Sequence, residues 1–220
     1  MNISAVGTAR RLKRLDEFVE VTGDALTTSY ESVGIEIPDM EVVITRKWGP
    51  VTGANVNVEN FLQLHVSAST PVDLLYEVVS HEALHNMRMN TGVFEYKTVG
   101  SRILEEGLAA HFGYSQAIAN GSTDTSSLPN CVHGVRDATK DVVRMLGNRY
   151  NRNINDLMKI HNNTVPYNIG YSALTILRDP LLPIDRGLFL AEQDEIFERL
   201  GEAIGANMQD RAFQEGRDLQ

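Results

Sequence analysis

The chain has 220 residues, of which 42% are hydrophobic and 22% are charged, and its acidic residues outnumber its basic residues 29 to 20. This composition is that of an ordinary globular protein, and it argues against a collagen-like repeat, a coiled coil and bulk disorder. The net charge of −9 disfavours a nucleic-acid partner, because nucleic-acid binders normally carry a basic surplus. The single cysteine, Cys131, cannot form a disulfide within the chain, so folding does not depend on an oxidising compartment.

The first residues do not fit a secretory signal peptide. Their apolar stretch is too short for one, and the basic residues follow it instead of preceding it. Arg10, Arg11, Lys13 and Arg14 form a basic cluster, which we interpret as one solvated helix face, with a docking or targeting patch as the alternative. No run of about 18 apolar residues occurs, so we expect no membrane span. We therefore expect a cytoplasmic protein, or one translocated without a cleavable signal peptide.

The first part of the chain predicts one helix followed by short strands. Apolar residues three or four positions apart predict a helix over residues 8–32, weakened at Gly23. Residues 40–45 are rich in β-branched side chains and predict a strand. Residues 55–58 and 61–67 alternate apolar with polar side chains, which is the period of a half-buried strand. Together these segments predict a small antiparallel sheet.

The character of the chain changes at Thr70 and Pro71, because a hydroxyl residue before proline is a helix-start signal. A helix is predicted over residues 71–89. Further helical patterns cover residues 101–119, 135–146, 154–161, 167–177 and 189–206, with a polar loop at 120–130. The layout predicts an α+β fold, in which a mainly helical C-terminal lobe follows the N-terminal sheet. We treat residues 1–220 as a single domain, with an α/β lobe over 1–120 and a helical lobe over 121–220.

The candidate chemistry begins at residues 81–85, which read HEALH. Residues four apart in a helix project from the same face one turn apart, so His81 and His85 can bind one metal ion. Glu82 lies on the adjoining flank, where it can reach a water molecule without being a ligand. A metallohydrolase needs this arrangement. The alternative is a surface pair of histidines, which the apolar surrounding segment LLYEVVSHEALHNM disfavours.

A catalytic zinc site normally has a third protein ligand and one open position. In the metzincin pattern a glycine and a histidine follow three and six residues after the second histidine, but here these positions are Arg88 and Thr91. In the gluzincin pattern a glutamate comes from a following helix. Residues 103–112 read ILEEGLAAHF, and Glu106 lies 21 residues after His85.

HEALH followed by LEEGLAAHF resembles the gluzincin metallopeptidases, which include the thermolysin-like and aminopeptidase N-like families. The resemblance implies a zincin-like fold that holds one Zn²⁺ ion through His81, His85 and Glu106. It also implies that Glu105 bonds to a ligand histidine and orients its imidazole. The alternative for Glu105 is a solvated acid near the start of a helix, where the helix dipole favours a negative charge.

Residues 165–174 read VPYNIGYSAL, which is similar to the Pro-Tyr-x-x-Gly helix start of the aminopeptidase N-like branch. This likeness implies that Tyr167 donates a hydrogen bond to the oxyanion of the reaction. Tyr171, one helical turn later, is the fallback, and an ordinary core position is the alternative for both. The Gly-x-Met-Glu-Asn motif, which anchors a substrate amino terminus in that branch, is missing from residues 54–72. Its absence favours an endopeptidase over an exopeptidase.

These observations predict a zinc-dependent peptidase with a protein or peptide substrate, and an endopeptidase with a narrow target fits best. Glu82 would take a proton from the attacking water and deliver it to the leaving amine. Three alternatives remain open. The chain could be a non-catalytic protein stabilised by zinc, a zinc hydrolase of non-peptide bonds, or a helical interaction protein with a chance motif and no zinc.

Overall fold

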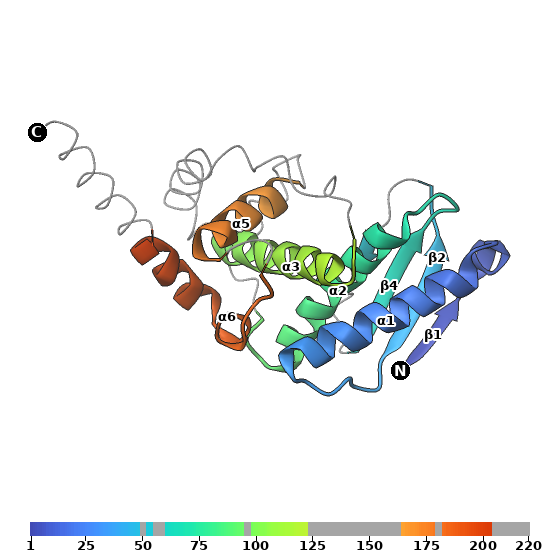
Figure 1. Cartoon of the computed structure of the whole chain (residues 1–220), viewed down its shortest axis with the longest axis horizontal. Coiled ribbons are helices and arrows are strands. Elements are labelled where there is room, and N and C mark those ends of the chain that lie inside the picture. Colours follow the sequence, from blue (N-terminus) through green and yellow to red (C-terminus); the bar gives the residue numbers. More distant parts are fainter. Residues whose placement is uncertain (49–51, 55–59, 95–97, 123–163, 179–181, 204–220) are drawn as a thin grey trace, which may run out of the picture. The chain divides into compact units, whose positions relative to one another are not determined.

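The computed structural model describes residues 1–48, 52–54, 60–94, 98–122, 164–178 and 182–203 (Figure 1). The fold is α+β, with a small sheet and mostly helical residues, as the sequence predicts. In the described part of the chain, no helix is long and apolar enough to span a membrane.

The chain divides into two compact units. The first comprises Met1–Phe94, Ala109–Leu128 and Pro180–Leu190, and the second comprises Glu95–Leu108, Pro129–Asp179 and Ala191–Gln220. Helix α3 (Val99–Ala119) is continuous and contributes residues to both. The lobes predicted over residues 1–120 and 121–220 stay a prediction.

The sheet lies in the first unit and has the strand order β1 (Asn2–Ala5), β2 (Glu41–Arg46), β4 (Phe61–Val66), β3 (Thr52–Ala54). Strands β1 and β2 are parallel, β2 and β4 are parallel, and only β3 runs antiparallel to its neighbour β4. The predicted antiparallel sheet is therefore wrong. Helix α1 (Leu15–Val33) connects β1 to β2, and a helical crossover of this kind leaves two strands pointing the same way.

The first forty residues differ from the prediction in two respects. Strand β1 was missed because it has four residues and no fully buried side chain, so it carries no alternation to detect. The helix predicted over residues 8–32 is a 3₁₀ turn, η1 (Gly7–Arg11), followed by α1. The basic cluster is therefore not one helix face, because it is divided between η1 and the connection to α1. The strand predicted at residues 55–58 lies outside the described residues.

The core of the first unit forms on one face of the sheet. Val42 and Ile44 of β2 are buried, and they stand in register with the buried Leu62 and Leu64 of β4. Alternate residues of the two strands point away from this face and are only half-buried or exposed, which confirms the predicted half-buried pattern. Helices α1 and α2 (Val72–Asn90) contact each other, and each contacts the sheet.

A buried hydrogen bond joins α1 to α2. The Tyr30 hydroxyl donates to Asn86 Oδ1 at 2.7 Å, and Asn90 Nδ2 donates to the same oxygen at 3.1 Å. Burial raises the pKa of the Tyr30 phenol, so the hydroxyl remains a donor at any physiological pH. Because Asn86 follows His85 directly, this contact fixes the rotation of α2 next to the HEALH residues.

The second unit is described mainly by its helices. The N-terminal part of α3 contacts α5 (Thr164–Leu177) at two glycines, where an added Cβ on Gly107 would lie 2.1 Å from the carbonyl carbon of Gly170. Both helices were predicted. The helices predicted at 135–146 and 154–161 lie outside the described residues. The pattern at 189–206 is interrupted, since α6 (Arg186–Leu190), which belongs to the first unit, ends before a separate helical segment over residues 193–203 in the second unit.

The Gly107–Gly170 contact leads to a first prediction. Replacing Gly107→Ala should lower the free energy of unfolding by about 1–3 kcal/mol, because the new methyl group would meet backbone atoms and force the helices apart. Chemical denaturation measures this loss. The matched control is Gly201→Ala, where an added Cβ meets nothing within 4 Å and the residue is helical. That change should leave stability equal or raise it by about 0.4–1 kcal/mol. Equal losses in both variants would contradict the close helix contact.

Candidate metal centre

Helix α2 carries the HEALH residues, and its start is set locally. Pro71 occupies the N-cap position with extended backbone angles, and Thr70 Oγ1 accepts a hydrogen bond from the Ser67 amide at 2.8 Å. Pro71 itself is extended, and a proline disfavours helical backbone angles in the residue before it, so the first helical residue of α2 is Val72. The helix predicted over 71–89 is confirmed within one residue at each end.

The two histidines of α2 lie in contact through their ring nitrogens. His81 Nε2 and His85 Nε2 are 3.2 Å apart, and their rings meet edge to face with centroids 4.9 Å apart. Zinc binds imidazole nitrogen at about 2.0–2.1 Å, so two such ligands on a tetrahedral ion stand about 3.3–3.4 Å apart. The spacing of the two nitrogens therefore fits a shared metal ion.

Glu106 of α3 completes the group. One ligand atom each from His81, His85 and Glu106 lies within 4.8 Å of the others, so the three can hold a metal ion. His85 and Glu106 are 5% and 4% exposed, and His81 is half-buried. Burial of a carboxylate together with two imidazoles is typical of a metal site, because such groups are costly to bury without a counter-charge. The structure thus brings together the three predicted ligands.

A glycine allows α3 to approach α2 closely. A Cβ added to Gly113 would lie 2.6 Å from the Glu77 carbonyl oxygen and 3.1 Å from the His81 amide nitrogen. Any side chain at position 113 would therefore push α3 away from α2 at His81. Gly113 lies about two turns after Glu106 on the same helix. The sequence analysis missed this residue, although a glycine inside a long apolar helix often marks a close packing contact.

Arg102 is a second residue that sequence reasoning missed. Its Nε lies 3.7 Å from Glu106 Oε1, one turn away along α3. The spacing i, i+4 between a base and an acid was the available signal. The guanidinium supplies a positive charge beside the buried Glu106 carboxylate.

Glu105 is fully buried and accepts a hydrogen bond of 2.8 Å from Gln193 Nε2. This environment does not fit a solvated acid at a helix start, because α3 begins six residues earlier at Val99. The amide of Gln193 holds the Glu105 carboxylate in one orientation. A bond from Glu105 to a ligand histidine stays a prediction.

The remaining predicted residues are placed as follows. Glu82 lies on α2 between the two histidines and is half-buried. Tyr171 lies on α5 and is 1% exposed. Tyr167 also lies on α5, but its side chain is outside the part of the structure that is described.

The structure also accounts for the two positions that fail the metzincin pattern. Arg88 is fully buried and donates hydrogen bonds to the carbonyl oxygens of Phe189 and Val93. Thr91 follows the last residue of α2, and its hydroxyl donates to the Arg88 carbonyl at 3.0 Å. Arg88 therefore ties the last turn of α2 to the segments that contain Val93 and Phe189, and Thr91 caps the end of the helix.

Comparison with known proteins adds nothing to this geometry, because no protein-family model and no curated protein matches the chain.

The cluster leads to a second prediction. Zn²⁺ should bind the purified protein in a 1:1 ratio and raise its melting temperature, because a ligand at 100 times its Kd stabilises the native state by about 2.7 kcal/mol. Titration calorimetry and thermal unfolding measure the two effects. His85→Gln and Glu106→Gln should each lower zinc affinity strongly. The control Glu195→Gln removes an exposed carboxylate that pairs with Arg199, and should leave affinity unchanged. Full affinity in the Glu106 variant would show that another group is the third ligand.

Proposed function

We propose that the protein is a zinc-dependent peptidase of the gluzincin type. The observation that carries the proposal is the group formed by His81, His85 and Glu106, with Glu82 between the two histidines. Two imidazoles and one carboxylate favour zinc over magnesium or calcium, which prefer oxygen ligands. Zinc in this group would polarise a substrate carbonyl and lower the pKa of water.

Glu82 acts in this proposal as the general base and then as the general acid. Its position next to His81 places it on the flank of α2, so it can reach water near the ligand cluster without joining the ligands. The carboxylate takes a proton from the attacking water and transfers it to the nitrogen of the leaving amine. A peptide amine leaves readily only after protonation, so both transfers are needed.

Tyr167 stabilises the oxyanion that forms when the carbonyl is attacked. Support comes from the position of α5, whose Gly170 backbone meets α3 at Gly107, the residue after Glu106. Tyr167 precedes Gly170 by less than one helical turn, so its backbone belongs to the same contact region. A phenol suits the role because it is a neutral donor at the pH where the enzyme works.

The proposed substrate is a polypeptide cut within its chain. The resemblance of residues 81–85, 103–112 and 165–174 to gluzincin motifs supports peptide-bond cleavage. The missing amino-terminus anchor in residues 54–72 supports an endopeptidase with a narrow target.

The third prediction concerns Glu82. Glu82→Gln should keep zinc and lower kcat by about 10²–10⁴, because the amide can neither accept nor return the proton. The assay is cleavage of a diverse peptide library with mass-spectrometric identification of products, beside zinc calorimetry on the same sample. Asp73→Asn is the control, since it makes the same change at an exposed position of the same helix. Undiminished cleavage by the Glu82 variant would remove Glu82 from the mechanism. Zinc binding without any cleavage by the wild type would favour a non-catalytic scaffold or a hydrolase of other bonds.

The fourth prediction separates the two tyrosines. Tyr167→Phe should lower kcat by about 10²–10³ with little change in KM, because the lost hydrogen bond exists mainly in the transition state. Tyr171→Phe should leave kcat nearly unchanged, since the Tyr171 side chain of α5 is buried and only 1% exposed. Steady-state kinetics on a cleaved peptide measure both. The reverse pattern would assign the oxyanion role to Tyr171.

A further inference from the structure

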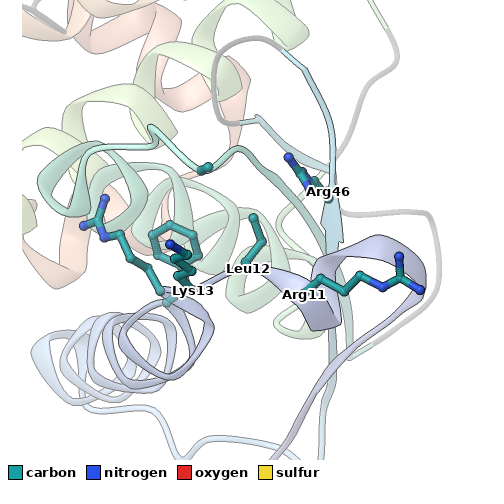
Figure 2. A pocket seen from close by; sticks show the side chains of 7 residues that line it. Arg11, Leu12, Lys13 and Arg46 are labelled. Carbon is teal, nitrogen blue, oxygen red and sulfur yellow. The ribbon is translucent and has the colours of Figure 1, made fainter.

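A pocket that includes none of the candidate metal ligands lies in the first unit. It has a volume of about 390 Å³ and is lined by the end of η1, the connection to α1, the first turn of α1, the last residue of β2 and the segment after β4. These residues are Arg11, Leu12, Lys13, Arg14, Phe18, Arg46 and Ala68. Figure 2 shows Leu12 between Lys13 and Arg46, with the Arg11 side chain extending outward at the rim. The volume is at the small end of the range for pockets that bind small molecules.

The inner wall of this basic pocket is apolar and fixed. Phe18 is fully buried and Leu12 is 7% exposed. The Arg14 guanidinium stacks on the Phe18 ring at 5.1 Å and donates to the Thr70 carbonyl at 3.0 Å. It also forms two hydrogen bonds to the Glu17 carboxylate, at 2.6 and 3.0 Å. Because the Glu17 carboxylate balances its charge, Arg14 forms part of the pocket wall and is not one of the cations available to a bound anion.

Three other cations of the basic pocket lack an acidic partner. Among the described residues, no carboxylate pairs with Arg11, Lys13 or Arg46, and the Arg46 guanidinium lies 5.9 Å from the centroid of the exposed Trp48 ring. This gathering is unexpected in a chain with 29 acidic and 20 basic residues. Because these cations line one pocket, a bound anion would supply the acidic partner that they lack.

The location of the basic pocket also favours a ligand. Strands β1, β2 and β4 are parallel, and the pocket residues follow their carboxyl ends at Ala5, Arg46 and Val66. In sheets with parallel strands, ligands bind in the crevice outside this edge. The N-terminus of α1, at Leu15, adds a partial positive charge directly after Lys13 and Arg14.

We propose that the basic pocket binds a small molecule that carries a phosphate group. The phosphate lies between Lys13 and Arg46, which line the pocket on either side of Leu12, and the rest of the molecule lies along the partly exposed Arg14 side chain. A phosphate fits better than a single carboxylate because its three terminal oxygens can accept hydrogen bonds from several cations at once. The proposal is independent of the peptidase assignment, because none of these residues belongs to the candidate metal centre.

The fifth prediction tests this site by titration calorimetry on the full chain, with inorganic phosphate and a nucleoside monophosphate as probes. Both should bind saturably, and the nucleoside monophosphate should bind more tightly because its base can also stack on the partly exposed Arg14 guanidinium. Lys13→Gln and Arg46→Gln should each weaken binding by about tenfold or more, which is the usual effect of losing a charged hydrogen bond. Arg199→Gln is the charge-matched control and should bind as the wild type does, since Arg199 pairs with Glu195 elsewhere.

Three results would overturn the proposal. Equal weakening in the Arg199 variant would show an effect of overall charge. Equal affinity for the two probes would contradict the proposed contact between Arg14 and the rest of the ligand. Binding of an acidic peptide or of anionic vesicles, with no saturable binding of either phosphate probe, would assign the cations to a macromolecular surface.

Discussion

The close approach of α3 to α2 at Gly113 is the constraint on which the candidate site depends. The α3 backbone lies so near Glu77 and His81 that position 113 has no room for a side chain. A second glycine on the same helix, Gly107, makes the contact with α5. Each glycine inside a helix costs about 1 kcal/mol relative to alanine. We infer that α3 tolerates this cost because a side chain at either position would collide with backbone atoms of the neighbouring helix.

The buried charges near the ligand cluster follow from this arrangement. A buried carboxylate is stable only with a counter-charge or hydrogen-bond donors. Glu106 lies beside Arg102, and Glu105 accepts a hydrogen bond from Gln193. A divalent ion would supply the larger counter-charge to Glu106. The contact with Arg102 and the burial of Glu106 hold its carboxylate in place before a metal arrives, which reduces the cost of ordering it on binding.

The sequence was sufficient to predict features that depend on local spacing. The pair His81 and His85 follows from the helical repeat, and Glu106 follows from the motif that resembles gluzincins. The half-buried pattern of β4 follows from its alternation. These features need no knowledge of which segments meet in space.

The features that the sequence did not predict depend on contacts between distant segments. Strand direction is set by the α1 crossover between β1 and β2, and the strand segments alone do not encode it. The role of Gly113 depends on which helix lies opposite it. Arg102 is an exception, because its i, i+4 spacing to Glu106 is visible in the sequence. The basic cluster at residues 10–14 was interpreted as a helix face because composition does not show two of its features. Arg14 pairs with Glu17, and Arg11, Lys13 and Arg14 line a pocket at the carboxyl edge of the sheet.

The most direct test of the central claim is zinc-edge X-ray absorption on the zinc-loaded protein. The account predicts a four-coordinate ion with two imidazole ligands, one carboxylate and one further oxygen, with metal–ligand distances of about 2.0–2.2 Å. The imidazole scattering should fall to a single ring in the His85→Gln variant. A sulfur ligand at about 2.3 Å, or an unchanged spectrum in that variant, would contradict the assignment of His81, His85 and Glu106 as the metal centre.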